Sequence, residues 1–350
     1  MVTYFKYLYS FFFALCGALI AQKLHLPIPW LLGPLFITAL LKINNVPIAC
    51  HKSARQIGLL IIGLSLGLYF TPDMIRIVLS HWMVLLFGLA FALILGALTA
   101  CIVYKWGNVD FKTAWFASAV GGANEMANLA EHYQARVDKV ASAHALRVVL
   151  VVVIIPFFYE FMGWQGTDLT EIASIPIHWG NFTLLFILCL IGCFIFKKFK
   201  LPNPWTFGPL LVAILLTANS IQLSSIPPSI LHLGQVLLGW SLGNKFSQSF
   251  FKTAPKYMSV VACANILSIA LAFLFSYILI FFVDLPLPTI LLGLAPGGVA
   301  EMTLTAKVLH LGVPMVTAFH VVRMIGVMST VGPLYFYIDK KFNPDHKKID

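Results

Sequence analysis

The chain has 350 residues, of which 60% are hydrophobic and only 10% are charged, and its formal net charge is +10. Soluble domains carry about 25% charged residues, so this composition predicts an integral membrane protein and excludes an ordinary soluble enzyme or binding domain. The positive charge could indicate a nucleic-acid-binding protein, but no basic, aromatic-interleaved domain stands outside the hydrophobic segments. Because Lys and Arg gather in cytoplasmic loops, we expect membrane lipid and no direct nucleic acid among the partners.

The hydrophobic pattern divides the chain into two halves of six segments each, and the longest segments can cross a bilayer core of roughly 30 Å. The segments of the first half cover about 7–22, 30–44, 56–70, 81–104, 111–134 and 138–162. Those of the second half cover about 181–196, 204–219, 231–246, 257–283, 288–310 and 314–337. Gly and Pro mark the segment ends and interrupt the second and fifth segments. We predict membrane repeats over 1–162 and 181–338, an extracytoplasmic linker over 163–180 and a cytoplasmic tail over 339–350.

A duplication at an offset of 175 to 176 residues relates the two halves. The block LPIPWLLGPL at 26–35 matches LPNPWTFGPL at 201–210. Further along, GGANEM at 121–126 and HALR at 144–147 recur as GGVAEM at 297–302 and HVVR at 320–323. Two unrelated hydrophobic halves would rarely share these residues in the same order, so we interpret the halves as copies of one ancestral segment.

Two other sets of duplicated residues have architectural interpretations. Pro29 and Pro204 suit the first turn of a helix, and the tryptophans that follow them suit the membrane interface. A series of glycines at spacings of four or five predicts close helix packing. These glycines are Gly58, Gly63, Gly67, Gly234, Gly239 and Gly243.

The distribution of Lys and Arg favours an inverted arrangement of the halves. If all six segments of each half cross the membrane, the loop charges split 11 to 10 between the two sides. If the fifth segment instead turns back at its double glycine, the split becomes 18 to 3, with Arg147 and Arg323 inside the membrane. The positive-inside rule favours the uneven split. We therefore predict an all-α membrane protein with two inverted repeats, each of five transmembrane helices plus a re-entrant helical hairpin, and both termini in the cytoplasm.

The double glycines mark the predicted binding site. A Gly-Gly turn between two half-helices exposes backbone N–H groups and a positive helix N-terminus, and inverted-repeat transporters use this device to bind anionic groups and ions. The duplicated glutamate, histidine and arginine stand close by in otherwise apolar sequence. The predicted substrate- and ion-binding residues are Gly121, Gly122, Asn124, Glu125, His144, Arg147, Gly297, Gly298, Glu301, His320 and Arg323.

Each of these residue types has two interpretations. The glutamates fall in the first turn of the second half-helix, where they either complement the helix dipole or bind a proton or cation. The histidines either relay protons or act as hydrogen-bonding groups. The arginines either hold the hairpin through a Glu–Arg pair or bind an anion. Asn124 has Ala300 as its counterpart, so we expect the two hairpins to contact a substrate differently.

With these motifs, the sequence resembles the AbrB family of Gram-negative integral membrane proteins, which is distinct from the small DNA-binding regulator of the same name. The resemblance covers almost the whole chain and rests on both copies of GGxxEM, HxxR and PxPWxxGPL. It implies a multi-pass protein of the cell inner membrane. Family proteins carry labels as regulators of gene expression and as ammonia monooxygenases. The predicted arrangement also resembles, at the level of fold, cation–proton antiporters and anion transporters.

We expect a secondary transporter that moves a small anionic solute by alternating access, coupled to protons or cations. The alternative is a membrane regulator that affects gene expression indirectly. An ammonia monooxygenase would need a metal or organic cofactor, and the ten histidines show no HExxH spacing. We therefore expect no enzyme activity, no cofactor and no metal, with a small molecule or ion as the substrate. The sequence leaves open whether the chain forms a homo-oligomer.

Overall fold

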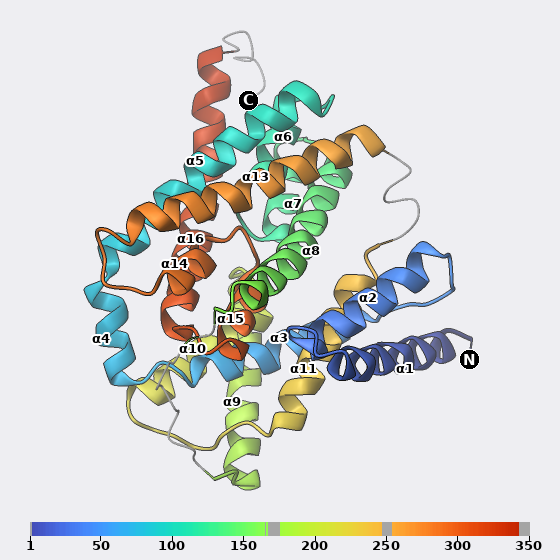
Figure 1. The fold of residues 1–350 in the computed structure, drawn as a ribbon, viewed down its shortest axis with the longest axis vertical. Helices are drawn as coiled ribbons and strands as arrows, with labels where there is room; N and C mark the ends of the chain where they lie inside the picture. Colours follow the sequence, from blue (N-terminus) through green and yellow to red (C-terminus); the bar gives the residue numbers. More distant parts are fainter. Residues whose placement is uncertain (1, 165, 167–175, 247–253, 343–350) are drawn as a thin grey trace. The chain divides into compact units, whose positions relative to one another are not determined.

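The computed structural model describes residues 2–164, 166, 176–246 and 254–342, which form α-helices joined by loops with no β-strand among them (Figure 1). Described helices of the first half are α1 (Val2–Lys23), α2 (Pro29–Ile43), α3 (Lys52–Gly67), α4 (Pro72–Ser80), α5 (Trp82–Trp106), α6 (Phe111–Ser118), α7 (Ala123–His132) and α8 (Val137–Phe161). Those of the second half are α9 (Trp179–Lys198), α10 (Pro204–Ala218), α11 (Pro228–Gly243), α13 (Pro255–Leu279), α14 (Leu287–Leu294), α15 (Val299–Val308) and α16 (Val313–Phe342). The predicted all-α class is confirmed for these residues.

The predicted membrane character is confirmed, although the predicted number of spanning helices is not. Five of the described helices, α5, α8, α9, α13 and α16, are long and apolar enough to cross a membrane. Helices α3 and α4 would add a sixth if they form one broken span, and they are bent by 88°. Helices α2 and α10 have 15 residues each, which is about 22 Å of helix and less than a hydrocarbon core of ~30 Å. Ten spanning helices therefore remain a prediction.

In each half, Gly and Pro predict interruptions in the second and fifth segments, and the structure shows an interruption in the fifth segment alone. Residues 119–122 separate α6 from α7, and residues 295–298 separate α14 from α15, so the fifth segments are broken at their double glycines. The second segments are not interrupted, because Pro34 and Pro209 lie inside the continuous helices α2 and α10. Helix α4 is not predicted from the sequence. It begins after Thr71, whose side chain accepts a hydrogen bond from Met74 N.

The duplication also appears in the backbone of the turns. Left-handed backbone conformations are uncommon for residues other than glycine. They recur here at the offset of the sequence duplication, with φ between 42° and 61°. The pairs are His25 with Lys200, Ile28 with Asn203, Asn45 with Ser220, and Gln134 with His310. Equivalent turns of the two halves therefore have the same local structure.

The chain forms two compact units, and each contains segments of both halves. Unit 1 comprises Met1–His81, Val152–Thr253 and Val299–Thr317, and unit 2 comprises Trp82–Val151, Ala254–Gly298 and Ala318–Asp350. The first hairpin, α6–α7, lies wholly in unit 2, whereas the second is divided, with α14 in unit 2 and α15 in unit 1. The two hairpins are alike in sequence but differ in the unit that holds their second helix. Much of the predicted linker (165 and 167–175) and of the predicted tail (343–350) lies outside the described residues.

In unit 1, glycines allow helices of one half to pack against helices of the other. A Cβ atom at Gly63 of α3 would lie 2.5 Å from the carbonyl oxygen of Thr206 in α10. In the equivalent contact, a Cβ atom at Gly239 of α11 would lie 2.2 Å from the carbonyl oxygen of Leu31 in α2. A Cβ atom would also meet a neighbouring helix within 3 Å at Gly58, Gly67, Gly234 and Gly243. The prediction of close helix packing at these glycines is confirmed.

In unit 2, the two ends of the first hairpin lie together. The backbone N–H of Arg136, which follows α7, donates to Oγ1 of Thr113 at the start of α6, at 3.0 Å. A pocket of about 590 Å³ lies beside them, and its lining includes Lys105, Asp110, Arg136 and Lys256. These residues come from the end of α5, the approach to α6, the approach to α8 and the start of α13. Three cations and one acid therefore meet at these helix ends.

Candidate functional site

An arginine and a histidine of α8 hold the end of α6. Arg147 donates through Nη1 to Ala119 O at 2.8 Å and through Nη2 to Gly121 O at 2.9 Å. Nη2 also lies 2.8 Å from Nδ1 of His144, and Nε2 of His144 lies 2.9 Å from Phe116 O. The last carbonyl groups of a helix have no partner within the helix. His144 supplies a partner for Phe116 O in the last turn of α6, and Arg147 binds two carbonyl groups just beyond the helix; both side chains are buried.

The same contacts recur in the second half, where α16 holds the end of α14. Arg323 donates to Ala295 O and to Gly297 O, each at 2.6 Å. Its Nη2 lies 2.7 Å from Nδ1 of His320, whose Nε2 lies 3.0 Å from Leu292 O. Each acceptor is separated from its equivalent in the first half by 176 residues. We call each arginine–histidine pair, with the carbonyl groups that it binds, a clamp.

The clamp geometry determines which histidine nitrogen carries the proton. A guanidinium group can only donate hydrogen bonds, so Nδ1 of each histidine must be the acceptor. The hydrogen then lies on Nε2, which donates to the carbonyl oxygen of the hairpin helix. Each histidine is therefore neutral in this arrangement. Of the two predicted roles, this geometry favours the hydrogen-bonding role, because a proton on Nδ1 would break the contact with the arginine.

The contacts through which the arginines hold the hairpins are made to backbone carbonyl groups. A cation near the C-terminus of a helix is favoured by the helix dipole, which explains an arginine at this position. In both arginines Nη1 and Nη2 are engaged, while Nε is buried and has no hydrogen-bond partner within the described residues. The positive charge of each clamp therefore stays close to the hairpin tip.

The double glycines do not supply left-handed turns. Gly122 has φ −69° and ψ 141°, which any residue can adopt. Among the described glycines, the one with positive φ is Gly163. A Cβ atom at Gly121 would lie 2.8 Å from Cε of Met126, the end of a flexible side chain that would have to shift. At the predicted asymmetric position, Asn124 is exposed and Ala300 is buried.

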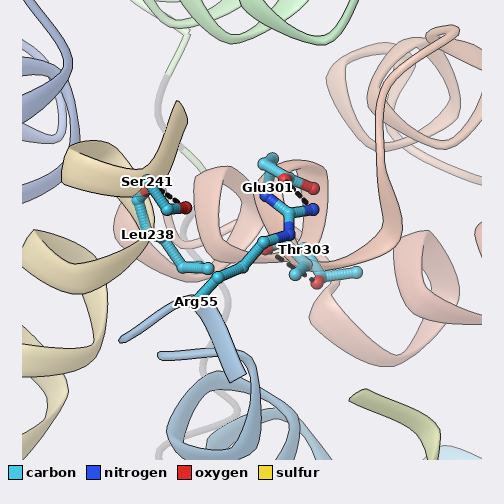
Figure 2. Close-up of polar contacts among 6 residues, drawn as sticks. Arg55, Leu238, Ser241, Glu301 and Thr303 are labelled. Atoms are coloured by element: carbon cyan, nitrogen blue, oxygen red, sulfur yellow. Dashed lines mark hydrogen bonds and ion pairs between the residues drawn. The ribbon is translucent and has the colours of Figure 1, made fainter. Parts of the chain in front are cut away.

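Glu301 forms an ion pair that the sequence did not predict. It lies in the first turn of α15 and is 4% exposed, and its Oε1 is 3.9 Å from Nη2 of Arg55 in the first turn of α3 (Figure 2). Figure 2 also shows Ser241 of α11, whose hydroxyl donates to Leu238 O at 2.9 Å. Nη1 of Arg55 is buried without a hydrogen-bond partner in the described part of the chain. All three residues belong to unit 1.

A second cation, Lys245, interacts electrostatically with this pair. It follows the end of α11, and it is exposed. Desolvation of the ammonium group and the charge of Arg55 lower the pKa of Lys245 to about 8, whereas the charge of Glu301 opposes this shift. Two cations and one carboxylate thus interact where α3, α11 and α15 come together. We call Arg55, Lys245 and Glu301 the charged triad.

A second contact holds the other end of α15 to α3. Nζ of Lys307 donates to the hydroxyl of Ser65, and it lies 5.4 Å from the ring centroid of Tyr69, just beyond α3. Helix α15 is therefore attached to the α3 region at both ends. In unit 2, Glu125 lies in the first turn of α7 and is half-buried. Equivalent glutamates of the two halves thus have different surroundings.

Sequence reasoning missed Arg55 and Lys245 because neither has a counterpart in the duplication. The residue equivalent to Arg55 is Leu231, and the residue equivalent to Lys245 is Tyr69. Both cations fall at the ends of predicted segments, 56–70 and 231–246, where the charge pattern resembles that of ordinary loop cations. The available signal was a basic residue three positions before Gly58, within one helical turn of a close-packing glycine. Within the described ranges, no three His, Cys, Asp or Glu residues gather as a metal would require.

Comparison with known proteins places this architecture in a family. A family model described as "Transition state regulatory protein AbrB" matches residues 30–339, which is most of the chain. The chain belongs to the AbrB family. It is 25% identical over 346 residues to "Uncharacterized protein YhjN" of Bacillus subtilis (strain 168), covering 91% of this chain and 89% of the relative. It is 21% identical over 311 residues to "Putative regulator AbrB" of Escherichia coli (strain K12), covering 88% and 89%.

Proposed function

We propose that this AbrB-family chain is a secondary transporter, which moves a small anionic solute across the cell inner membrane by alternating access, coupled to protons or cations. The observation that carries the proposal is the pair of clamped, broken hairpins. In a membrane, irregular backbone is tolerated where it is buried in protein or lines a water-filled cavity. Transporters with inverted repeats place their solute and ion sites at such breaks.

The lengths and ends of the first hairpin support a re-entrant path. Helix α6 has 8 residues and α7 has 10, or about 12 and 15 Å, so neither helix could cross a bilayer alone. The hydrogen bond between Arg136 and Thr113 holds the two ends of the hairpin together. The pocket that gathers Lys105, Arg136 and Lys256 supports the same path, because full crossing would separate Lys105 from Arg136. Inverted repeats and cytoplasmic termini are part of the proposal.

The predicted site residues have distinct roles in this proposal. The arginines and histidines of the clamps keep each hairpin broken, and the buried arginine charge favours an anion near the glycine tips. Glu125 and Glu301 bind the coupling proton or cation. The burial of Glu301 and the half-exposure of Glu125 give the two glutamates unequal access to solvent in this conformation. In the alternate conformation of the transport cycle, Glu125 would be buried and Glu301 would be exposed to solvent.

Solute flux into proteoliposomes tests the proposal. The purified protein should take up at least one class of radiolabelled small anion, and an imposed pH or sodium gradient should drive that uptake. Glu125→Gln and Glu301→Gln should each uncouple uptake from the gradient. Arg76→Gln is the matched control, because the Arg76 side chain is 80% exposed and pairs with a neighbouring surface acid. If no anion class is transported, the proposed function is wrong.

The name of the Escherichia coli relative supports a second candidate, a membrane regulator of gene expression. A transporter can change expression through the solute that it moves, so the two candidates predict different results for the glutamates. The test is complementation of a deletion strain. If a variant with both Glu125→Gln and Glu301→Gln restores the wild-type phenotype, the protein acts as a regulator without transport. If it fails to do so although it is present in the membrane, transport is favoured.

A further inference from the structure

The charged triad lies in a region where several sources of positive potential converge. Arg55 and Glu301 lie in the first turns of α3 and α15, and the N-terminus of each helix carries a partial positive charge. The first turn of α3 contains no acid that would balance this charge, and it holds Lys52 in addition to Arg55. The charge of Arg55 also acts on Lys245. The carboxylate of Glu301 is the negative charge that pairs with these cations.

The contact between Arg55 and Glu301 is not an optimal ion pair. Hydrogen-bonded guanidinium–carboxylate pairs have N–O distances of about 2.7–2.9 Å and often use two parallel hydrogen bonds. Here a single pair of atoms approaches to 3.9 Å. The second terminal nitrogen of Arg55, Nη1, is buried and has no hydrogen-bond partner within the described residues. Arg55 therefore has a buried hydrogen-bond donor without a partner among the described residues, and its contact with Glu301 is long enough for another anion to replace it.

We propose that Arg55 and Lys245 bind the carboxylate group of a small monoanionic solute, and that Glu301 occupies this position as an internal substitute when the solute is absent. This inference rests on the proposed function, because it names the class of solute. Binding would bring two carboxylate oxygens to the guanidinium fork and release Glu301 from Arg55. Helix α15 would stay attached to the α3 region through Lys307, Ser65 and Tyr69.

The charge balance selects a monoanion over a dianion. Two cations and one carboxylate leave one positive charge in excess, which a monocarboxylate neutralises. A dianion such as sulfate would leave the site with one net negative charge, which is less favourable than a neutral site. The side chain of Glu301 also shows that a carboxylate can approach this guanidinium. Replacing Glu301 with glutamine would leave two uncompensated positive charges and should change the preference toward dianions.

The test is equilibrium binding of ¹⁴C-acetate to the purified full-length protein in detergent at pH 7, with sulfate, a dianion at this pH, as competitor. The wild type should bind acetate saturably, and sulfate should compete weakly. Glu301→Gln should bind acetate about tenfold more tightly and should gain sulfate competition, because the internal competitor is gone. Arg55→Gln should weaken acetate binding by about tenfold or more. Arg76→Gln, an exposed cation of the same unit, should bind like the wild type.

Arg55→Lys and Lys245→Gln keep the proposal testable if Arg55→Gln does not fold. Both should weaken acetate binding, the first through loss of the planar fork and the second through loss of charge. The proposal is overturned if the wild type binds no acetate, or if the variants of the triad bind it like the wild type. Acetate binding without flux in proteoliposomes would refute transport but not this site. Flux of monocarboxylates that is insensitive to Arg55 would refute the site but not transport.

Discussion

Removal of Arg323 should be one of the most destabilising single substitutions in this chain. In Arg323→Met, the new side chain fills a similar volume but cannot donate hydrogen bonds. Three acceptors then lose their partner, namely the buried Ala295 O and Nδ1 of His320 and the partly buried Gly297 O. A buried acceptor without a partner costs about 1–3 kcal/mol. Removal of a buried guanidinium recovers part of this cost, so we expect a loss of about 3–5 kcal/mol in the free energy of unfolding.

Reversible unfolding in mixed micelles of SDS and a mild detergent, followed by tryptophan fluorescence, measures this loss. Arg147→Met should cost a similar amount, because its clamp has the same contacts. Arg76→Met is the control, since it removes an ion pair whose side chains are about 80% exposed, and such pairs contribute about 0–1 kcal/mol. If Arg323→Met costs no more than this control, the clamp does not hold the hairpin.

Three further predictions concern unfolding in the same assay. Gly239→Ala should lower the free energy of unfolding by about 3 kcal/mol or prevent folding, because its Cβ would lie 2.2 Å from a backbone oxygen of α2. Gly180→Ala, with nothing within 4 Å of its Cβ, should instead raise the free energy of unfolding by about 0.5–1 kcal/mol. Trp240→Phe should cost about 1 kcal/mol through loss of a buried 2.7 Å hydrogen bond to a serine hydroxyl, and equal stability would contradict that contact. The folded-state pKa of Lys245 is lowered from 10.5 to about 8, so the unfolded state binds more protons between about pH 8 and 10.5. The stability of the wild type should therefore rise with pH relative to that of Lys245→Gln across this window. A difference in stability that does not change with pH would refute the lowered pKa.

Some features of the site follow from the sequence because they depend on local spacing and are duplicated. The double glycines predict the breaks between α6 and α7 and between α14 and α15, and the HxxR spacing places a histidine and an arginine on one helix face. The contacts of His144 and Arg147 recur at His320 and Arg323 in the structure. What the spacing cannot specify is the partner of each side chain. Carbonyl groups, which every residue carries, are the partners here, and no sequence pattern identifies them.

Other features depend on packing between segments that are far apart in the sequence. Arg55 meets Glu301 because α3 and α15 pack together in unit 1, although 246 positions separate the two residues. The copies share most of their motifs, so a search based on duplication overlooks residues that occur in one copy alone. Pro34 and Pro209 mislead for another reason. Each lies in the first half of its helix and removes a single backbone hydrogen bond, so the helix continues past it.

The most direct test of the account is the side of the membrane from which the residues after each hairpin can be reached. His132 and Val308 are equivalent, exposed positions at the ends of α7 and α15. His132→Cys and Val308→Cys would be introduced one at a time into a variant that lacks the six native cysteines. An impermeant maleimide should label the first from the cytoplasm and the second from the outside. Labelling of both from the same side would mean that the halves are not inverted, and it would contradict alternating access through two opposed hairpins.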